Sequence, residues 1–199
     1  MRVTILLSSL ASIALAAPTA CPTKVTASLI EQVMPTSNTC DGALDECRTA
    51  TQAAPYFESA MRQYALTHPA QIAAVLALVG LESGDLKYKH NIWPGRPGQG
   101  TSAMFMPNYV KLYVESIPEL QDQLTEDMDP DAILALVTPD EYNFGSGPWF
   151  LATQCEAAVR DELTTDPDAG FEAYMACVGV TVDEGRAAYW ERAKTAFHL

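Results

Sequence analysis

Basic residues are scarce in this sequence. Its 199 residues include 12 lysines and arginines against 25 aspartates and glutamates, which gives a formal net charge of −13. Nucleic acids and anionic membrane surfaces repel a protein of that charge, so we expect neither as a partner. The negative charge favours neutral or cationic partners, or function in an acidic medium, where protonation neutralises part of the charge.

Long apolar runs are also rare. The one such run covers residues 3–17, follows Arg2 and ends in small residues. This pattern is typical of a secretory signal peptide and is too short for a membrane anchor. We therefore predict a signal peptide over residues 1–16, a mature chain that begins at about Ala17, and secretion into the extracellular medium without membrane attachment.

The chain lacks a Cys-x-x-Cys motif, and its three histidines are scattered, so we predict no metal site and no cofactor. Its cysteines suit the disulfides of an exported protein; they are Cys21, Cys40, Cys47, Cys155 and Cys177. The short interval between Cys40 and Cys47 suits a local link, and Cys155 and Cys177 lie on consecutive helical patterns. Cys21 is then either an odd thiol or a competitor for Cys40, because spacing alone does not determine connectivity.

Paired segments of alternating polarity are absent too, which argues against a β fold. Apolar residues instead recur at three-and-four spacing, as they do in helices. The segments with this spacing are 27–34, 55–67, 69–82, 108–116, 130–137, 149–163, 170–178 and 183–197. We predict a mainly α protein with a single domain over residues 17–199, and leave open a short β-hairpin in its glycine-rich middle.

One predicted helix differs from the others. Residues 71–81 read QIAAVLALVGL and are apolar on nearly every face, which places this helix at the centre of the domain. Glu82 follows it directly. Burial and the carboxyl end of the helix dipole both disfavour a charged carboxylate there, so we expect a raised pKa and a role as a general acid. The alternative is an ordinary helix end with an exposed Glu82 and a Gly84 cap.

Two segments interrupt the helical pattern. Residues 84–107 are rich in glycine and proline, and residues 138–148 contain a second group of glycines. A loop of about twenty residues inside a compact domain is more often functional or anchored than idle. We therefore look for the functional site in these two segments, next to Glu82.

The residues around Glu82 resemble a known family. The segments LVGLESGDLKYKHN and PGQGTSAMFMP are similar to the lysozyme-like superfamily, in particular to lytic transglycosylases and goose-type lysozymes. Residues 82–84 match the catalytic Glu-Ser-Gly of that superfamily. Residues 100–107 approximate its Gly-x-Met-Gln-x-x-Pro element, with Phe105 in the place of the glutamine. A group of secreted fungal proteins shares these features and a Gly-Pro-Trp segment.

The resemblance implies a lysozyme-like domain with Glu82 as general acid. The implied function is that of a secreted, monomeric glycoside hydrolase or lyase that cleaves β-1,4 bonds in peptidoglycan or a related chitin-like polymer of N-acetylglucosamine. The residues predicted to bind this polysaccharide substrate are Ser83, Tyr88, Asn91, Gln99, Gly100, Thr101 and Met104.

Two further points stay open at this stage. A second catalytic carboxylate is to be sought in Asp85, Asp140 or Glu141, although relatives in that superfamily function with a single glutamate. The alternative function is a non-catalytic, secreted glycan-binding or effector-like protein on the same fold.

Overall fold

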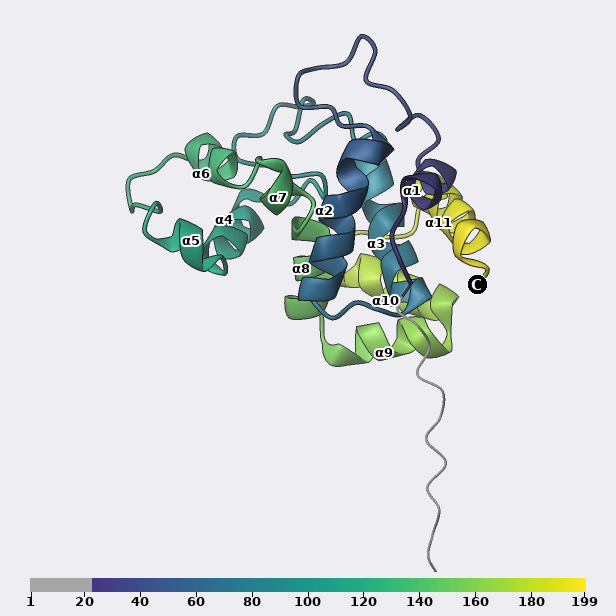
Figure 1. Cartoon of the computed structure of the whole chain (residues 1–199). Coiled ribbons are helices and arrows are strands. Elements are labelled where there is room, and N and C mark those ends of the chain that lie inside the picture. The colour runs from purple at the N-terminus through teal and green to yellow at the C-terminus, as the bar shows by residue number, and fades with distance from the viewer. Residues whose placement is uncertain (1–22) are drawn as a thin grey trace, which may run out of the picture.

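The computed structural model describes residues 23–199, and eleven helices lie within that range (Figure 1). They are α1 Ala27–Val33, α2 Ala50–Gln63, α3 Pro69–Glu82, α4 Pro107–Glu115, α5 Pro118–Gln121, α6 Pro130–Leu136, α7 Asp140–Asn143, α8 Ser146–Thr153, α9 Ala157–Thr165, α10 Pro167–Val178 and α11 Glu184–Phe197. The prediction of one mainly α domain is confirmed. The predicted signal peptide, its cleavage site and Cys21 lie outside the described residues.

Helix α3 occupies the centre of the molecule. It packs against α1, α8, α9, α10 and α11, and residues 72–80 are all buried (Figure 1). A helix enclosed on every side has no use for a polar face, which explains the continuous apolar run in its sequence. Gly80 permits a close contact with α11, because a Cβ there would lie 2.6 Å from the ring of Tyr189.

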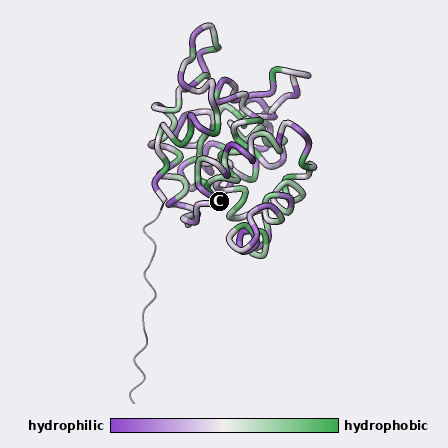
Figure 2. Tube along the Cα trace, turned by 90° about the vertical axis from the view of Figure 1, so that its right-hand side faces the viewer, coloured by the Kyte–Doolittle hydropathy of each residue, from purple (hydrophilic) through white to green (hydrophobic). Residues whose placement is uncertain are grey.

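Helices α2 and α4 are amphipathic, as expected of elements that bury one side only. Figure 2 shows hydrophilic and hydrophobic residues interspersed along the trace. Helices α5 and α6 both pack on α4, and the three form a lobe to one side of α2, seen at the left of Figure 1. Within residues 23–199, no helix has the length and apolar character needed to cross a membrane.

Several helices begin or end away from their predicted positions. Helix α2 spans Ala50–Gln63 rather than residues 55–67, and its early start follows from a capping box in which the side chains of Thr49 and Gln52 each bind the other's backbone N–H. Helix α10 begins at Pro167 rather than at residue 170, because the Asp166 side chain caps it. The helix predicted over residues 149–163 is two helices, α8 and α9, which separate at Cys155. Its disulfide to Cys177 holds this corner against the end of α10.

The glycine-rich middle is not a regular hairpin. Gly100 forms isolated antiparallel bridges to His90 and to Phe105, and the described part of the chain contains no longer strand there. Gly100 is buried, and a Cβ on it would lie 2.5 Å from the carbonyl oxygen of Lys89. Glycine at this position therefore allows two backbone segments to approach each other closely.

The structure confirms both local disulfide pairings. Cys40 is bonded to Cys47 across a separation of 7 residues, and Cys155 to Cys177 across 22. A cross-link stabilises a fold mainly by reducing the entropy of the unfolded chain, and the gain grows with the length of the closed loop.

Removal of the shorter disulfide tests this account. We expect Cys40→Ser/Cys47→Ser to lower the free energy of unfolding by about 2 kcal/mol, the value for so short a loop. Urea denaturation of the oxidised wild-type protein and the variant measures the difference. An unchanged midpoint would contradict a stabilising role for this disulfide.

Candidate functional site

Glu82 is the last residue of α3 and lies at the boundary between core and solvent. Its side chain is 22% exposed, and its Oε1 accepts a hydrogen bond of 2.6 Å from Nη2 of Arg186 on α11. Nη1 of Arg186 donates a second bond of 2.6 Å to Asp183, which caps the same helix. One guanidinium is thus shared between two carboxylates.

Burial raises the pKa of Glu82, because a carboxylate loses hydration when it leaves water. The positive charge and hydrogen bond of Arg186 oppose this effect, and the negative charge of Asp183 adds to it. The raised pKa agrees with the direction expected from the sequence. The ion pair with Arg186 was not expected, because no feature of the sequence marks a cation as the partner of Glu82.

Glu82 lies between two cavities, which we call together the Glu82 groove. The first has a volume of about 400 Å³ and is lined by Leu81, Glu82, Tyr88, His90, Asn91, Ile92, Trp93 and Met104. The second has about 360 Å³ and is lined by Glu82, Gln99, Ala103, Met104, Phe105, Met106, Tyr109, Val178, Gly179, Val180 and Arg186. Glu82 and Met104 belong to both cavities, so the pair Glu82–Arg186 is a polar point between mainly apolar and aromatic walls.

The structure divides the predicted binding residues into two sets. Tyr88 and Met104 line the groove together with the loop residues Asn91 and Gln99. The other three predicted residues are buried in the domain; they are Ser83, Gly100 and Thr101.

Ser83 and Gly84 terminate α3. The Ser83 hydroxyl donates a 2.6 Å bond to the Val79 carbonyl and accepts one of 2.8 Å from the N–H of Leu86. Gly84 has a φ of +58°, a conformation that favours glycine. Both residues are therefore explained by the end of the helix, without reference to a ligand.

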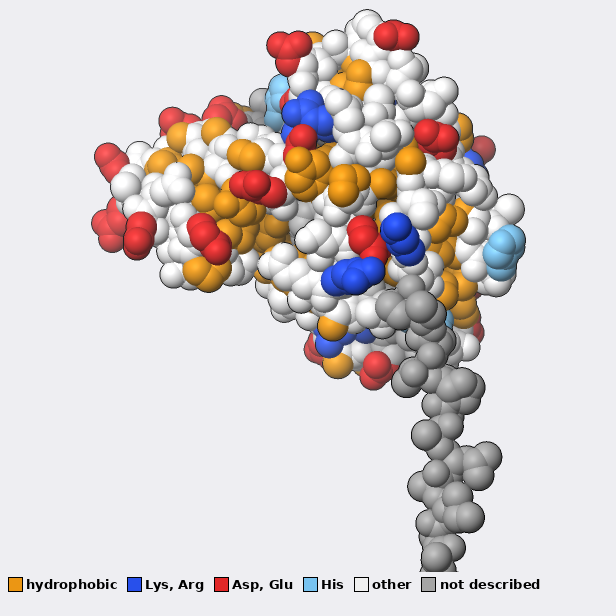
Figure 3. Space-filling view, viewed as in Figure 1, with side chains coloured by type: hydrophobic (Ala, Val, Ile, Leu, Met, Phe, Trp, Pro, Cys, Tyr) orange, Lys and Arg blue, Asp and Glu red, His pale blue; other side chains and the backbone are white. Residues whose placement is uncertain are grey.

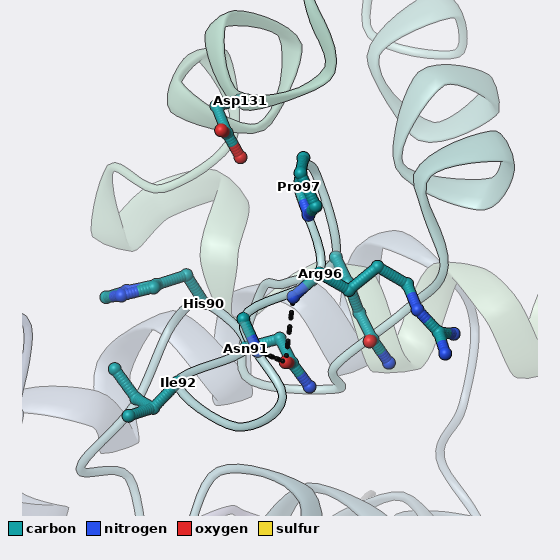
Figure 4. Close-up of a pocket in the computed structure, with 8 residues that line it drawn as sticks. His90, Asn91, Ile92, Arg96, Pro97 and Asp131 are labelled. Atoms are coloured by element: carbon teal, nitrogen blue, oxygen red, sulfur yellow. Dashed lines mark hydrogen bonds between the residues drawn. The ribbon is translucent and has the colours of Figure 1, made fainter.

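Asn91 and Gln99 hold the glycine-rich loop in shape. The Asn91 Oδ1 accepts hydrogen bonds from the backbone N–H groups of Gly95 (2.8 Å) and Arg96 (3.1 Å), as Figure 4 shows. The side-chain amide of Gln99 donates to the carbonyl of Met104 at 3.1 Å. The polar atoms of both side chains therefore form hydrogen bonds within the loop, and the loop positions Ile92 and Trp93 at the groove.

The other carboxylates considered from the sequence do not face Glu82. Asp85 is buried, with Oδ2 accepting from the Thr36 hydroxyl (2.7 Å) and Oδ1 from the Tyr189 hydroxyl (2.6 Å). Asp140 forms ion pairs with Lys89 and with Arg48; burial raises its pKa, but the hydrogen bonds and charges of the two cations outweigh burial and hold the pKa below its ordinary value. Both aspartates therefore have structural roles. Within residues 23–199, no three His, Cys, Asp or Glu side chains gather as ligands for a metal ion.

Comparison with known proteins gives one informative match. No protein-family model matches the chain. A curated protein of Fusarium oxysporum (strain Fo5176), described as a bifunctional dioxygenase (DOX)-epoxy alcohol synthase (EAS), is 51% identical over 158 residues. The aligned region covers 75% of this chain but 12% of that relative, so the chain corresponds to a small part of a much longer protein.

This finding overturns the family resemblance. A relative at 51% identity is named for oxygenation and epoxy alcohol synthesis, not for glycan cleavage. The assignment to the lysozyme-like superfamily is therefore wrong, as are the glycosidase or lyase activity, the glycan-binding alternative and the polysaccharide substrate. The physical reason is that the apolar run is explained by the burial of α3, and Ser-Gly is explained by the capping of its C-terminal end. Many unrelated folds contain a buried helix that ends in this way.

Proposed function

We propose that this domain binds an amphipathic, oxygen-bearing hydrocarbon in the Glu82 groove. The observation that carries the proposal is the composition of the groove, in which the ion pair Glu82–Arg186 lies at two cavities whose lining residues are mostly apolar or aromatic, with His90, Asn91 and Gln99 as the other polar ones. Binding sites for small molecules commonly have this form, with volumes of about 300–1,000 Å³ and a few polar groups that fix orientation.

The relative supports the same class of ligand. Its name describes a dioxygenase and an epoxy alcohol synthase, and an epoxy alcohol is a hydrocarbon that bears an epoxide and a hydroxyl group. Oxygenated derivatives of long-chain fatty acids belong to this class. Because the chain spans 12% of the relative's length, we propose binding of such a compound, not the relative's reactions.

The charges of the groove favour a neutral head group. Arg186 already binds Glu82 and Asp183, so the three ionised groups carry a net charge of −1. A carboxylate ligand would add a third negative charge beside Glu82, whose own ionisation burial already disfavours. A hydroxyl or epoxide oxygen adds no charge; the epoxide oxygen can accept a hydrogen bond there, and the hydroxyl can accept or donate one.

Trp93 provides a direct assay. It is 86% exposed at the groove, whereas Trp149 and Trp190 are buried, so a ligand in the groove changes the environment of Trp93 alone. We expect titration with the methyl ester of a long-chain epoxy alcohol to shift the tryptophan emission to shorter wavelength with saturation. The free acid should bind about tenfold more weakly, a difference of about 1.4 kcal/mol.

Two matched variants separate the groove from the rest of the surface. Ile92 lines the groove and is 48% exposed, and Leu112 on α4 is 43% exposed and lines neither cavity. We expect Ile92→Asp to weaken binding by at least about tenfold and Leu112→Asp to change it by less than about twofold. An absence of saturable binding, or equal losses in the two variants, would refute the proposal.

A further inference from the structure

A separate polar cavity lies between α2, α4, α5 and α7. It has a volume of about 430 Å³ and shares no lining residue with the Glu82 groove. Three tyrosines and two glutamates from these elements line it: Tyr64, Tyr113, Glu119, Glu141 and Tyr142. We call it the Tyr–Glu cavity.

The two carboxylates of the cavity have no cation of their own. Glu119 and Glu141 take part in none of the ion pairs formed among residues 23–199. No lysine, arginine or histidine lines the cavity. On the face seen in Figure 3, the lobe of α4 to α6 at the left shows acidic side chains and no basic ones. The cavity therefore attracts positive charge.

The tyrosines bring further hydrogen-bond acceptors to the same place. Glu119, Glu141 and Tyr142 line the same cavity; burial raises the pKa of Tyr142, and the charges of the two carboxylates raise it further. Burial also raises the pKa of Tyr64 and of Tyr113. A hydrogen bond between these two side chains raises the pKa of Tyr113 further and partly offsets the rise at Tyr64. All three phenols therefore stay neutral at physiological pH, with oxygens that can accept hydrogen bonds.

We propose that the Tyr–Glu cavity binds the ammonium group of a small primary alkylamine. An ammonium group has one positive charge and three N–H donors, which match the two carboxylates and the phenol oxygens. The walls lack the three acidic, His or Cys side chains of a metal site as far as the chain is described, and the volume suits an organic molecule.

Calorimetric titration of the full chain with pentylamine tests this site. At constant ionic strength we expect saturable binding of one molecule per chain. The double variant Glu119→Gln/Glu141→Gln should bind at least about tenfold more weakly, because it loses both charge-assisted hydrogen bonds. A lack of saturable binding to the wild-type protein would overturn the proposal.

The control double variant removes the same charge elsewhere. Glu126 and Glu156 are exposed and lie outside the Tyr–Glu cavity, so Glu126→Gln/Glu156→Gln should leave the affinity within about twofold of wild type. Equal losses in the two double variants would assign the binding to the overall negative charge and overturn the site. Thermal melting verifies that both variants are folded.

Two competing ions test the chemistry of recognition. Tetramethylammonium has the same single charge as pentylammonium but no N–H donor, and calcium has a higher charge but no apolar body. We expect neither to displace pentylamine at equal concentration. Displacement by tetramethylammonium would overturn recognition through N–H groups, and displacement by calcium would replace the amine site with a metal site.

Discussion

Replacement of Gly170 by alanine is expected to destabilise the protein by about 3 kcal/mol or more. A Cβ at this position of α10 would lie 2.4 Å from the backbone nitrogen and 2.5 Å from the Cα of Leu163 on α9. Overpacking costs about 1–3 kcal/mol where side chains can move, and here the obstacle is backbone. The contact therefore outweighs the gain of about 1 kcal/mol that alanine has over glycine inside a helix.

Gly185 is the matched control for this prediction. It also lies in a helix, α11, but a Cβ there would have its nearest contacts at 3.4 Å, to Asp183 and Leu81, an ordinary van der Waals separation. We expect Gly185→Ala to leave the free energy of unfolding unchanged or to raise it by up to about 1 kcal/mol. Urea denaturation measures both variants. A Gly170→Ala protein as stable as wild type would contradict the close contact of α9 with α10.

Replacement of Arg186 by leucine is expected to cost about 3 kcal/mol at neutral pH. The side chains of Arg186 and Glu82 are only 14% and 22% exposed, so loss of the cation leaves a carboxylate that is poorly hydrated and unpaired. Removal of one partner of a buried ion pair costs about 3–5 kcal/mol, and partial exposure places this pair at the lower end.

The pH dependence of that loss identifies its cause. The folded protein already holds the pKa of Glu82 above its ordinary value of 4.5, and loss of Arg186 raises it further. A group with a raised acidic pKa binds its proton more tightly in the folded state, so its ionisation weakens the fold. This penalty is complete above the folded-state pKa and disappears as the pH falls below 4.5.

We therefore expect the stability gap between Arg186→Leu and wild type to shrink on acidification from neutral pH to below the ordinary pKa of Glu82. The double variant Glu82→Gln/Arg186→Leu has no buried carboxylate and should recover most of the lost stability at neutral pH. Denaturation curves at the two pH values measure both effects. A gap that is independent of pH would mean that Arg186 acts through packing alone.

Much of the fold was predictable because the relevant forces are local. Helix α3 was predicted at its observed bounds, since Pro69 suits the first turn and the apolar run ends at Glu82. The four-residue helices α5 and α7 were not predicted, because so short a segment shows no helical period. The division between α8 and α9 was also missed, since the apolar spacing runs on through Cys155.

The site was predictable only in part. Glu82 was expected to be poorly hydrated with a raised pKa, and the structure agrees. Its partner Arg186 lies 104 residues away along the chain, and no local pattern marked it. The family resemblance was wrong because it was based on a short motif, and the capping of α3 explains that motif without any shared function.

The sequence by itself determined the helical class and the central position of α3, because both follow from the apolar spacing of neighbouring residues. It favoured the two disulfides, and the structure decided that Cys40 pairs with Cys47. Its prediction of a signal peptide concerns residues outside the described range. Tertiary structure alone decided which groups face one another: the pair Glu82–Arg186 and the residues of the Tyr–Glu cavity. These contacts depend on how distant helices pack, and helix packing is a property of the whole fold.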